Sequence, residues 1–239
     1  MGMRFSGNVM LVAGGTGGLG RAVSQAFLEE GATVIATYRT QAEFDALVQV
    51  AAAGPSRLEG QRVDVTDEMA VRRLVEDVVA KYQRLDALVN TVGGYAGGVK
   101  LWDLETEVLD RMLALNLRSG YALSRAVVPV MLKQARGSIV NIAARAAFDH
   151  PAGAAAYAAS KAAALAMIAS LAAELAGTGV RVNSVLPNII DTEANRRAMP
   201  TADFAKWPKP EDIARVILFL CSTEAKVVHG ASIPVYGDR

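Results

Sequence analysis

The sequence predicts one α/β domain built on a doubly wound parallel sheet of about seven strands, with helices on both faces. Short apolar runs rich in Val and Ile alternate along the chain with longer segments of helical period. Those runs are continuously apolar, as expected of strands that are covered on both faces. Right-handed crossovers between such strands build a Rossmann-type sheet.

Each expected element has its own stretch of sequence. Strands are expected at residues 9–13, 33–37, 61–65, 87–90, 138–143, 181–186 and 232–236. Helices are expected at about 18–30, 41–53, 67–82, 154–176 and 210–221, and as a pair across 104–135. No linker divides the chain, so residues 1–239 form one predicted domain. The long irregular stretch 190–209 is interpreted as a substrate lid, with a plain surface excursion as the alternative.

Composition narrows the classes of function. The 25 Lys and Arg residues balance 24 Asp and Glu residues, which leaves a net charge of +1 and no electrostatic footprint for nucleic acid or a membrane surface. The single cysteine, Cys221, excludes an intramolecular disulfide and indicates a reducing, cytoplasmic compartment. Since the chain has only two histidines besides it, no metal site is expected. A small molecule is the expected substrate.

A glycine-rich turn follows the first expected strand and opens the first expected helix. Gly14, Gly18 and Gly20 lie in the segment AGGTGGLG at residues 13–20. Glycine lets the backbone adopt positive φ and approach a pyrophosphate closely. The helix N-terminus adds unpaired N–H groups and the positive end of its dipole. This strand–turn–helix context predicts a dinucleotide site.

Tyr157 and Lys161 form a second motif, Tyr-x-x-x-Lys, on the helix expected at 154–176. Residues four apart lie on one face of a helix. A neighbouring ammonium stabilises a phenolate and lowers the pKa of the tyrosine, which would let the phenol transfer a proton near neutral pH. The motif therefore predicts a proton-transfer site.

The two motifs together, about 140 residues apart, resemble the short-chain dehydrogenase/reductase family, and the resemblance extends over essentially the whole chain. It implies an NAD(P)-dependent oxidoreductase with Tyr157, Lys161 and Asn116 as catalytic residues, the last positioning a proton-relay water. It also implies a homodimer or homotetramer that assembles through the Tyr-bearing helix. The cofactor-binding residues that it implies are Gly14, Thr16, Gly18, Leu19, Gly20, Tyr38, Arg39, Asp64, Val65, Asn90, Gly93, Lys161, Pro187, Ile189 and Thr192.

The choice of nucleotide depends on the end of the second strand. Tyr38 stands where NAD-specific members of the family carry Asp, and Arg39 beside it can bind a 2′-phosphate through two hydrogen bonds. NADP is therefore expected and NAD is disfavoured, with a solvated surface charge as the alternative for Arg39. Asp64 and Val65 fit the family's adenine contact, unless Asp64 caps the helix that follows.

One residue departs from the family pattern. The family's catalytic Ser lies thirteen residues before the Tyr, where this chain has Ala144. That hydroxyl donates a hydrogen bond to the substrate oxygen as negative charge develops, and losing one such donor costs about 10²–10³ in rate. Three explanations are open. The protein is a catalytically inactive relative, or it donates a different hydroxyl such as that of Tyr95, or its substrate is not a ketone.

Local resemblance favours the third explanation. Residues 93–98, 143–149 and 186–207 resemble the dihydropteridine reductase branch of the family, which has Ala at the same position and an aromatic residue where Tyr95 stands. That branch implies an NAD(P)H-dependent reductase of a quinonoid dihydropterin or a similar planar heterocycle. The implied substrate residues are Tyr95, stacked on the ring, Ala144, and Trp207 on the lid. A conventional alcohol or ketone oxidoreductase and a dinucleotide-binding sensor with little catalysis are the alternatives.

Overall fold

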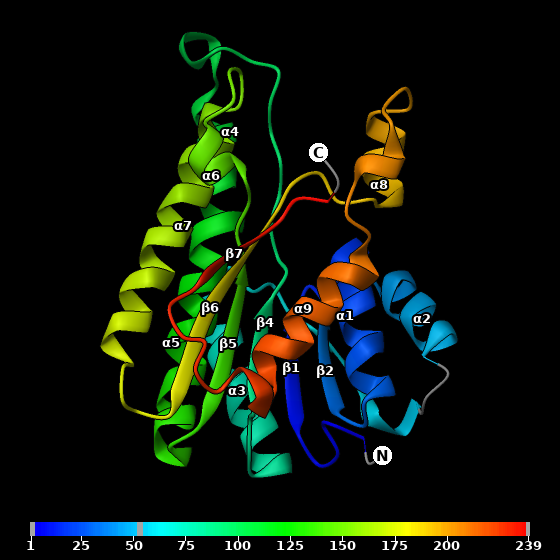
Figure 1. The fold of residues 1–239 in the computed structure, drawn as a ribbon, viewed down its shortest axis with the longest axis vertical. Coiled ribbons are helices and arrows are strands. Elements are labelled where there is room, and N and C mark those ends of the chain that lie inside the picture. Colours follow the sequence, from blue (N-terminus) through cyan, green and yellow to red (C-terminus); the bar gives the residue numbers. More distant parts are fainter. Residues whose placement is uncertain (1–2, 52–54, 238–239) are drawn as a thin grey trace.

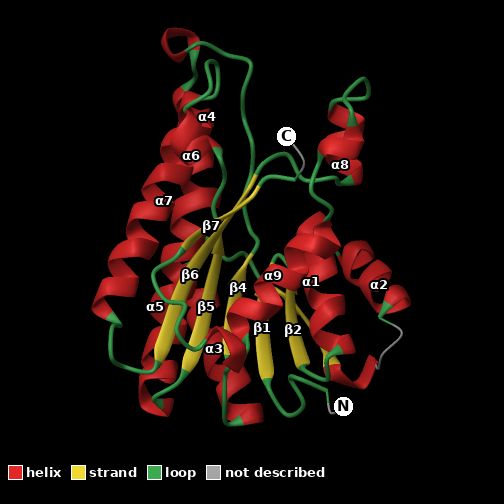
Figure 2. Cartoon of the chain, viewed as in Figure 1, coloured by secondary structure: helices red, strands yellow, loops and turns green. Residues whose placement is uncertain are grey.

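The computed structural model describes residues 3–51 and 55–237. They form one seven-stranded parallel sheet in the order β3-β2-β1-β4-β5-β6-β7. The strands are β1 (Val9–Ala13), β2 (Thr33–Tyr38), β3 (Leu58–Arg62), β4 (Ala87–Asn90), β5 (Gly137–Ile142), β6 (Val180–Pro187) and β7 (Ser232–Val235). The α-helices are α1 (Gly18–Glu29), α2 (Gln41–Val50), α3 (Glu68–Tyr82), α4 (Thr106–Leu113), α5 (Ser119–Gln134), α6 (Ala146–Asp149), α7 (Ala155–Glu174), α8 (Glu193–Ala198) and α9 (Pro210–Cys221). Helices cover both faces of the sheet, so the predicted fold class is confirmed (Figure 1 and Figure 2).

Alternating side chains of the strands build one core on each face of the sheet. On β1, Met10 and Val12 pack on one face with α1 and α9, while Leu11 points to the other face, toward α3 and α5. All five residues of β1 are buried, as a central strand between two helical layers requires. The two cores are thus mainly apolar, although several polar side chains, among them Asn116 and Lys161, are also buried.

The strand order reverses at β1, which lies between β2 and β4. Ala13, at the carboxyl end of β1, is in register with Asn90 at the end of β4. The glycine-rich turn after β1 and the loop after β4 therefore start side by side, and Thr91 N donates to the Ala13 carbonyl at 3.0 Å. Open α/β sheets bind ligands in the crevice at such a reversal, so this edge locates the site.

The third strand lies three residues earlier than predicted. The expected strand at 61–65 is instead Leu58–Arg62, an edge strand in which no residue is fully buried. Val63 and Val65, which suggested the strand, follow it and pack into the core beneath α3. The apolar residues Val63 and Val65 therefore indicate where the chain enters the core after the strand, not the strand itself.

The helical pair expected across 104–135 is one continuous helical stretch. α4 runs into five residues of π-helix, η3 (Ala114–Arg118), and then into α5. Such π-helical turns are frequent at functional sites, and this one carries Asn116. The helix expected at 41–53 ends at Val50, and residues 52–53 lie outside the described residues.

The predicted lid connects β6 to α9. It contains α8 and a short 3₁₀ helix, η4 (Phe204–Lys206), and α8 stands beyond the carboxyl ends of β1 and β2 in Figure 1. On the other side of the crevice, α7 packs against β6 and α4. This helix is long and apolar enough in composition to cross a membrane, but core helices of globular proteins pass the same test.

Candidate active site

The glycine-rich turn leaves no room for a side chain at Gly18 or Gly20. A Cβ added to Gly20 would lie 2.0 Å from the Gly14 carbonyl oxygen, and one added to Gly18 would lie 2.7 Å from Cγ2 of Thr192. Gly14 itself has φ of +72° and donates its N–H to Thr37 Oγ1 at 2.8 Å. No side chain caps α1 at Gly17, so the first N–H groups of the helix face the crevice. These residues fit a nucleotide pyrophosphate.

The ends of β2 and β3 form the adjoining edge of the crevice. The Tyr38 ring stacks on Phe44 of α2, with ring centroids 5.0 Å apart, and its hydroxyl donates to Gln41 Oε1 at 2.9 Å. The Arg39 guanidinium makes no hydrogen bond or ion pair with any described residue. Its backbone carbonyl accepts from Arg62 Nε at 3.1 Å. Arg39 and Arg62 thus lie together at this edge, and position 38 carries no carboxylate that would repel a 2′-phosphate.

Asp64 lies beyond the end of β3. Thr66 donates to Asp64 Oδ1 through its hydroxyl at 2.7 Å and its N–H at 2.9 Å, and these bonds, with a smaller effect of Arg39, hold the pKa of Asp64 below its ordinary value. The cap of α3 is Asp67, which accepts from the N–H groups of Met69 and Ala70. The alternative that Asp64 caps this helix is therefore wrong, while its contact with adenine stays a prediction.

The predicted catalytic residues converge where α7 meets η3. Asn116 Oδ1 accepts from Gly94 N at 2.9 Å, and its Nδ2 donates to Gly94 O and to Ser160 Oγ, both at 3.0 Å. A Cβ added to Gly93 would lie 2.8 Å from Asn116 Oδ1 and 3.1 Å from Lys161 Nζ. The loop after β4 therefore passes directly over both polar groups. Sequence reasoning did not identify Ser160 as the link from Asn116 to α7, although it lies within the Tyr-x-x-x-Lys motif.

Burial governs the protonation of the two motif residues. Lys161 Nζ donates to the Ile142 carbonyl at 2.9 Å, and burial lowers its pKa to about 8. Burial, with a smaller effect of Tyr95, raises the pKa of Tyr157 to about 12. The expected lowering of the Tyr157 pKa by the neighbouring ammonium is therefore wrong for this structure, because desolvation of the phenolate dominates the shift. The Tyr157 phenol therefore stays protonated at neutral pH.

The remaining cofactor candidates lie in several parts of the structure. Asn90 supports the strand end, since its Nδ2 donates to Asn141 Oδ1 at 3.1 Å and its Oδ1 accepts from Val92 N at 3.2 Å. Thr192 caps α8 by accepting from Asn195 N at 3.2 Å. The Pro187 carbonyl accepts a hydrogen bond from Arg145 N, and Thr16 Oγ1 donates to Glu43 at 3.4 Å. Ile189 is 37% exposed, whereas Leu19 and Val65 are buried in the two cores.

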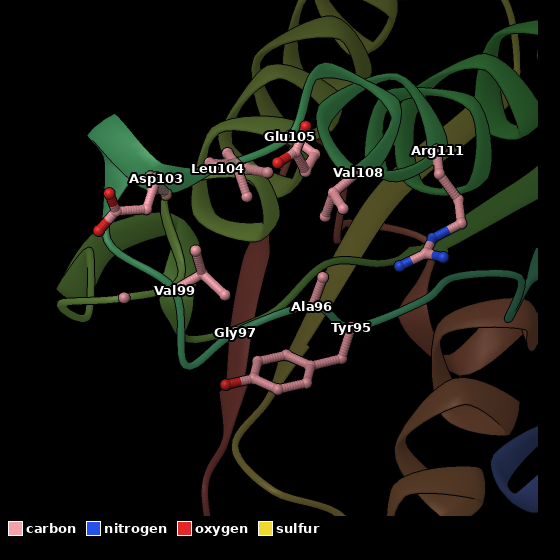
Figure 3. Close-up of a pocket in the computed structure, with 12 residues that line it drawn as sticks. Tyr95, Ala96, Gly97, Val99, Asp103, Leu104, Glu105, Val108 and Arg111 are labelled. Atoms are coloured by element: carbon pink, nitrogen blue, oxygen red, sulfur yellow. The ribbon is translucent and has the colours of Figure 1, made fainter.

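The three predicted substrate residues lie in different parts of the site region. The ring of Tyr95 packs edge-on against Tyr157, with centroids 5.0 Å apart and planes at 74°. Ala144 lies two residues beyond the end of β5 and is buried, 5% exposed. Trp207 packs on Phe204 within the lid, 5.0 Å between centroids. Tyr95 also borders a cavity of about 430 Å³ between the loop after β4, α4 and the start of α7 (Figure 3).

Known proteins of similar sequence and structure identify the family of this chain. Residues 8–203 match the family model for short chain dehydrogenase. The chain belongs to the short-chain dehydrogenase family. It is 37% identical to the 3-oxoacyl-(acyl-carrier-protein) reductase of Thermotoga maritima, over 98% of each chain, and 32% identical to the meso-2,3-butanediol dehydrogenase of Serratia marcescens, over 98% of this chain and 95% of the relative. The solved structure of ElxO with NADP bound superposes with a TM-score of 0.91 at 25% identity, over 96% of this chain and 97% of that chain.

These relatives bear on the prediction from sequence. The predicted membership of the short-chain dehydrogenase family is confirmed. The relatives are named as reductases and diol dehydrogenases, which favours the alternative of a conventional alcohol or ketone oxidoreductase over the dihydropteridine reductase reading. As a short-chain dehydrogenase, the chain uses a nicotinamide cofactor, and open α/β sheets generally bind ligands in a crevice of the kind described above.

Proposed function

We propose that this short-chain dehydrogenase is an NADP-dependent, cytoplasmic homo-oligomer that interconverts a small ketone and its alcohol. The observation that carries the proposal is the cluster of Tyr157, Lys161 and Asn116 beside the glycine-rich turn. The reductase and dehydrogenase names of the relatives support the substrate class. The pair Arg39 and Arg62, with the NADP-bound neighbour, supports NADP.

NADP in its reduced form supplies the hydride when bound. The chain's own residues then handle the proton. Tyr157, whose pKa is raised to about 12, stays protonated at neutral pH and donates to the oxygen that gains charge. Lys161, whose pKa is lowered to about 8, gains and loses a proton close to neutral pH and lies on the same helix face. The residues therefore suit reduction with Tyr157 as the acid.

A planar heterocycle such as a quinonoid dihydropterin is the second candidate substrate. Ala144 favours it, because a delocalised nitrogen-rich ring that accepts a hydride depends less on an oxyanion donor than a ketone does. The exposed ring of Tyr95 offers a surface on which such a substrate would stack.

Consumption of reduced cofactor separates these candidates. The wild type is assayed with NADPH and NADH against a panel of small ketones and against quinonoid dihydropterin, with Tyr157→Phe as the control for proton donation. We expect turnover of ketones, with NADPH preferred. Turnover of the dihydropterin alone would transfer the assignment to the second candidate. Tight NADPH binding with no turnover of either class would leave only the dinucleotide-binding sensor.

A further inference from the structure

Reduction of a ketone needs more than one donor at the reacting oxygen. The oxygen gains negative charge as hydride arrives, and a site that excludes water stabilises that charge with preorganised hydrogen bonds. Tyr157 supplies one such group from α7. The segment just beyond the end of β5, the strand next to it in the site, supplies only the buried methyl group of Ala144. A second donor must come from elsewhere in the site.

The nearby serine hydroxyls are already engaged. Ser160 Oγ donates to the backbone carbonyl of Tyr157 at 2.8 Å and accepts from Asn116 Nδ2 at 3.0 Å. Ser138 Oγ, at the opposite end of β5, donates to the Leu220 carbonyl at 3.1 Å. Neither hydroxyl can turn to the substrate without giving up a bond that it makes in the interior.

The hydroxyl of Tyr95 is different. It has no hydrogen-bond partner among the described residues, and Tyr95 is 69% exposed and borders the adjoining cavity. Its ring packs edge-on against the ring of Tyr157, 5.0 Å between centroids. The phenol is close enough to contribute to the raised pKa of Tyr157. A phenol with no hydrogen-bond partner among the described residues therefore packs against the ring of Tyr157.

The backbone holds Tyr95 in this position. A Cβ added to Gly97 would lie 2.1 Å from Tyr95 Oη and 2.6 Å from Cζ, so the ring lies flat along the chain at Gly97, as Figure 3 shows. On one side of Tyr95, both backbone polar groups of Gly94 bond to Asn116. On the other side, Val99 N donates at 3.3 Å to the carbonyl of Gly153, just before α7. The loop is thus fixed to the same elements that position Tyr157.

We propose that the Tyr95 hydroxyl is the second hydrogen-bond donor to the substrate oxygen and replaces the hydroxyl that Ala144 lacks. The inference rests on the proposed ketone reduction. Hydride adds to the carbonyl carbon, the π electron pair moves to the oxygen, and the Tyr157 proton passes to that oxygen to complete the alcohol. Tyr95 O–H donates a hydrogen bond during this step and keeps its proton.

Four variants test the proposal. Tyr95→Phe removes the hydroxyl and keeps the ring, Ala144→Ser restores a hydroxyl just beyond the end of β5, and the double variant combines them. Tyr121→Phe is the matched control, since that tyrosine is 42% exposed on α5 and bonds only to Arg125. Single-turnover rates with NADPH and a ketone are measured for each, with NADPH affinity from fluorescence and circular dichroism as the check on folding.

We expect Tyr95→Phe to lower the hydride-transfer rate by about 10²-fold with NADPH affinity unchanged, and Ala144→Ser in that background to restore at least about tenfold. Tyr121→Phe keeps the wild-type rate. A Tyr95→Phe rate equal to the wild type overturns the proposal, and so does a loss that Ala144→Ser does not restore, because the ring's packing then accounts for it. A wild type that reduces dihydropterin but no ketone also overturns it and leaves hydride transfer intact. Failure of the proposed function shows differently, as NADPH binding without turnover of any substrate.

Discussion

Burial of Lys161, the lysine of the Tyr-x-x-x-Lys motif, should make the free energy of unfolding depend on pH. Lys161 is 6% exposed, and its pKa falls from 10.5 to about 8 because burial disfavours the ammonium. That difference corresponds to roughly 3 kcal/mol between the folded and unfolded proteins. Since the folded pKa is lower than the unfolded one, the unfolded chain binds more protons between about pH 8 and 10.5. Stability must therefore rise with pH across this window.

The perturbation is Lys161→Met, which keeps the length of the side chain and removes the charge. The variant loses the bond from Nζ to the Ile142 carbonyl, at a cost of about 1–3 kcal/mol that does not depend on pH. The difference in unfolding free energy between wild type and variant isolates the lysine. From about pH 7 to about pH 9.5, the wild type should gain roughly 2 kcal/mol relative to the variant.

Urea unfolding, followed by circular dichroism at the two pH values, measures this difference. Groups other than Lys161 titrate in both proteins and cancel. A difference that stays constant with pH would refute the claim that burial depresses the lysine pKa. A relative loss of wild-type stability as pH rises would show that the folded protein stabilises the ammonium instead.

Two further predictions concern cofactor binding, measured by fluorescence of bound NADPH. Gly20→Ala should weaken NADPH binding at least about tenfold, because its Cβ would lie 2.0 Å from the Gly14 carbonyl oxygen. The control Gly17→Ala should bind NADPH nearly normally, because its Cβ would lie 3.5 Å from the same atom. Equal affinities of the two variants would contradict the packing of the turn. Arg39→Gln should weaken NADPH binding by about 10–100-fold and leave NADH binding nearly unchanged. The surface variant Arg72→Gln is the control. An equal loss of affinity for both nucleotides would show that Arg39 does not bind the 2′-phosphate.

The sequence predicted the sheet well, because buried strands and the turn between them depend on local patterns. Buried parallel strands show as short apolar runs, and the glycine-rich turn has to follow the first of them. β3 was misplaced because it is an edge strand with polar residues, while Val63 and Val65 beyond it pack into the core. An apolar run in the sequence indicates buried residues. It indicates a strand only where the buried residues are also the residues of the strand.

Within the candidate site, the placement of residues was easier to predict than their electrostatics. The convergence of Tyr157, Lys161 and Asn116 follows from motif spacing, but the raised pKa of Tyr157 depends on burial by segments far away in sequence. The same holds for Arg62, which reaches the nucleotide edge through the pairing of β2 with β3. Tertiary contacts of this kind leave no local signal.

Single-turnover transfer from NADPH carrying deuterium at the reactive carbon tests the central claim most directly. The wild type should place deuterium on the carbon of a ketone substrate, read by mass spectrometry. Tyr157→Phe should bind NADPH as tightly yet transfer about 10²–10⁴-fold more slowly. A product without deuterium, or an equal rate in Tyr157→Phe, would contradict hydride transfer with Tyr157 as the proton donor.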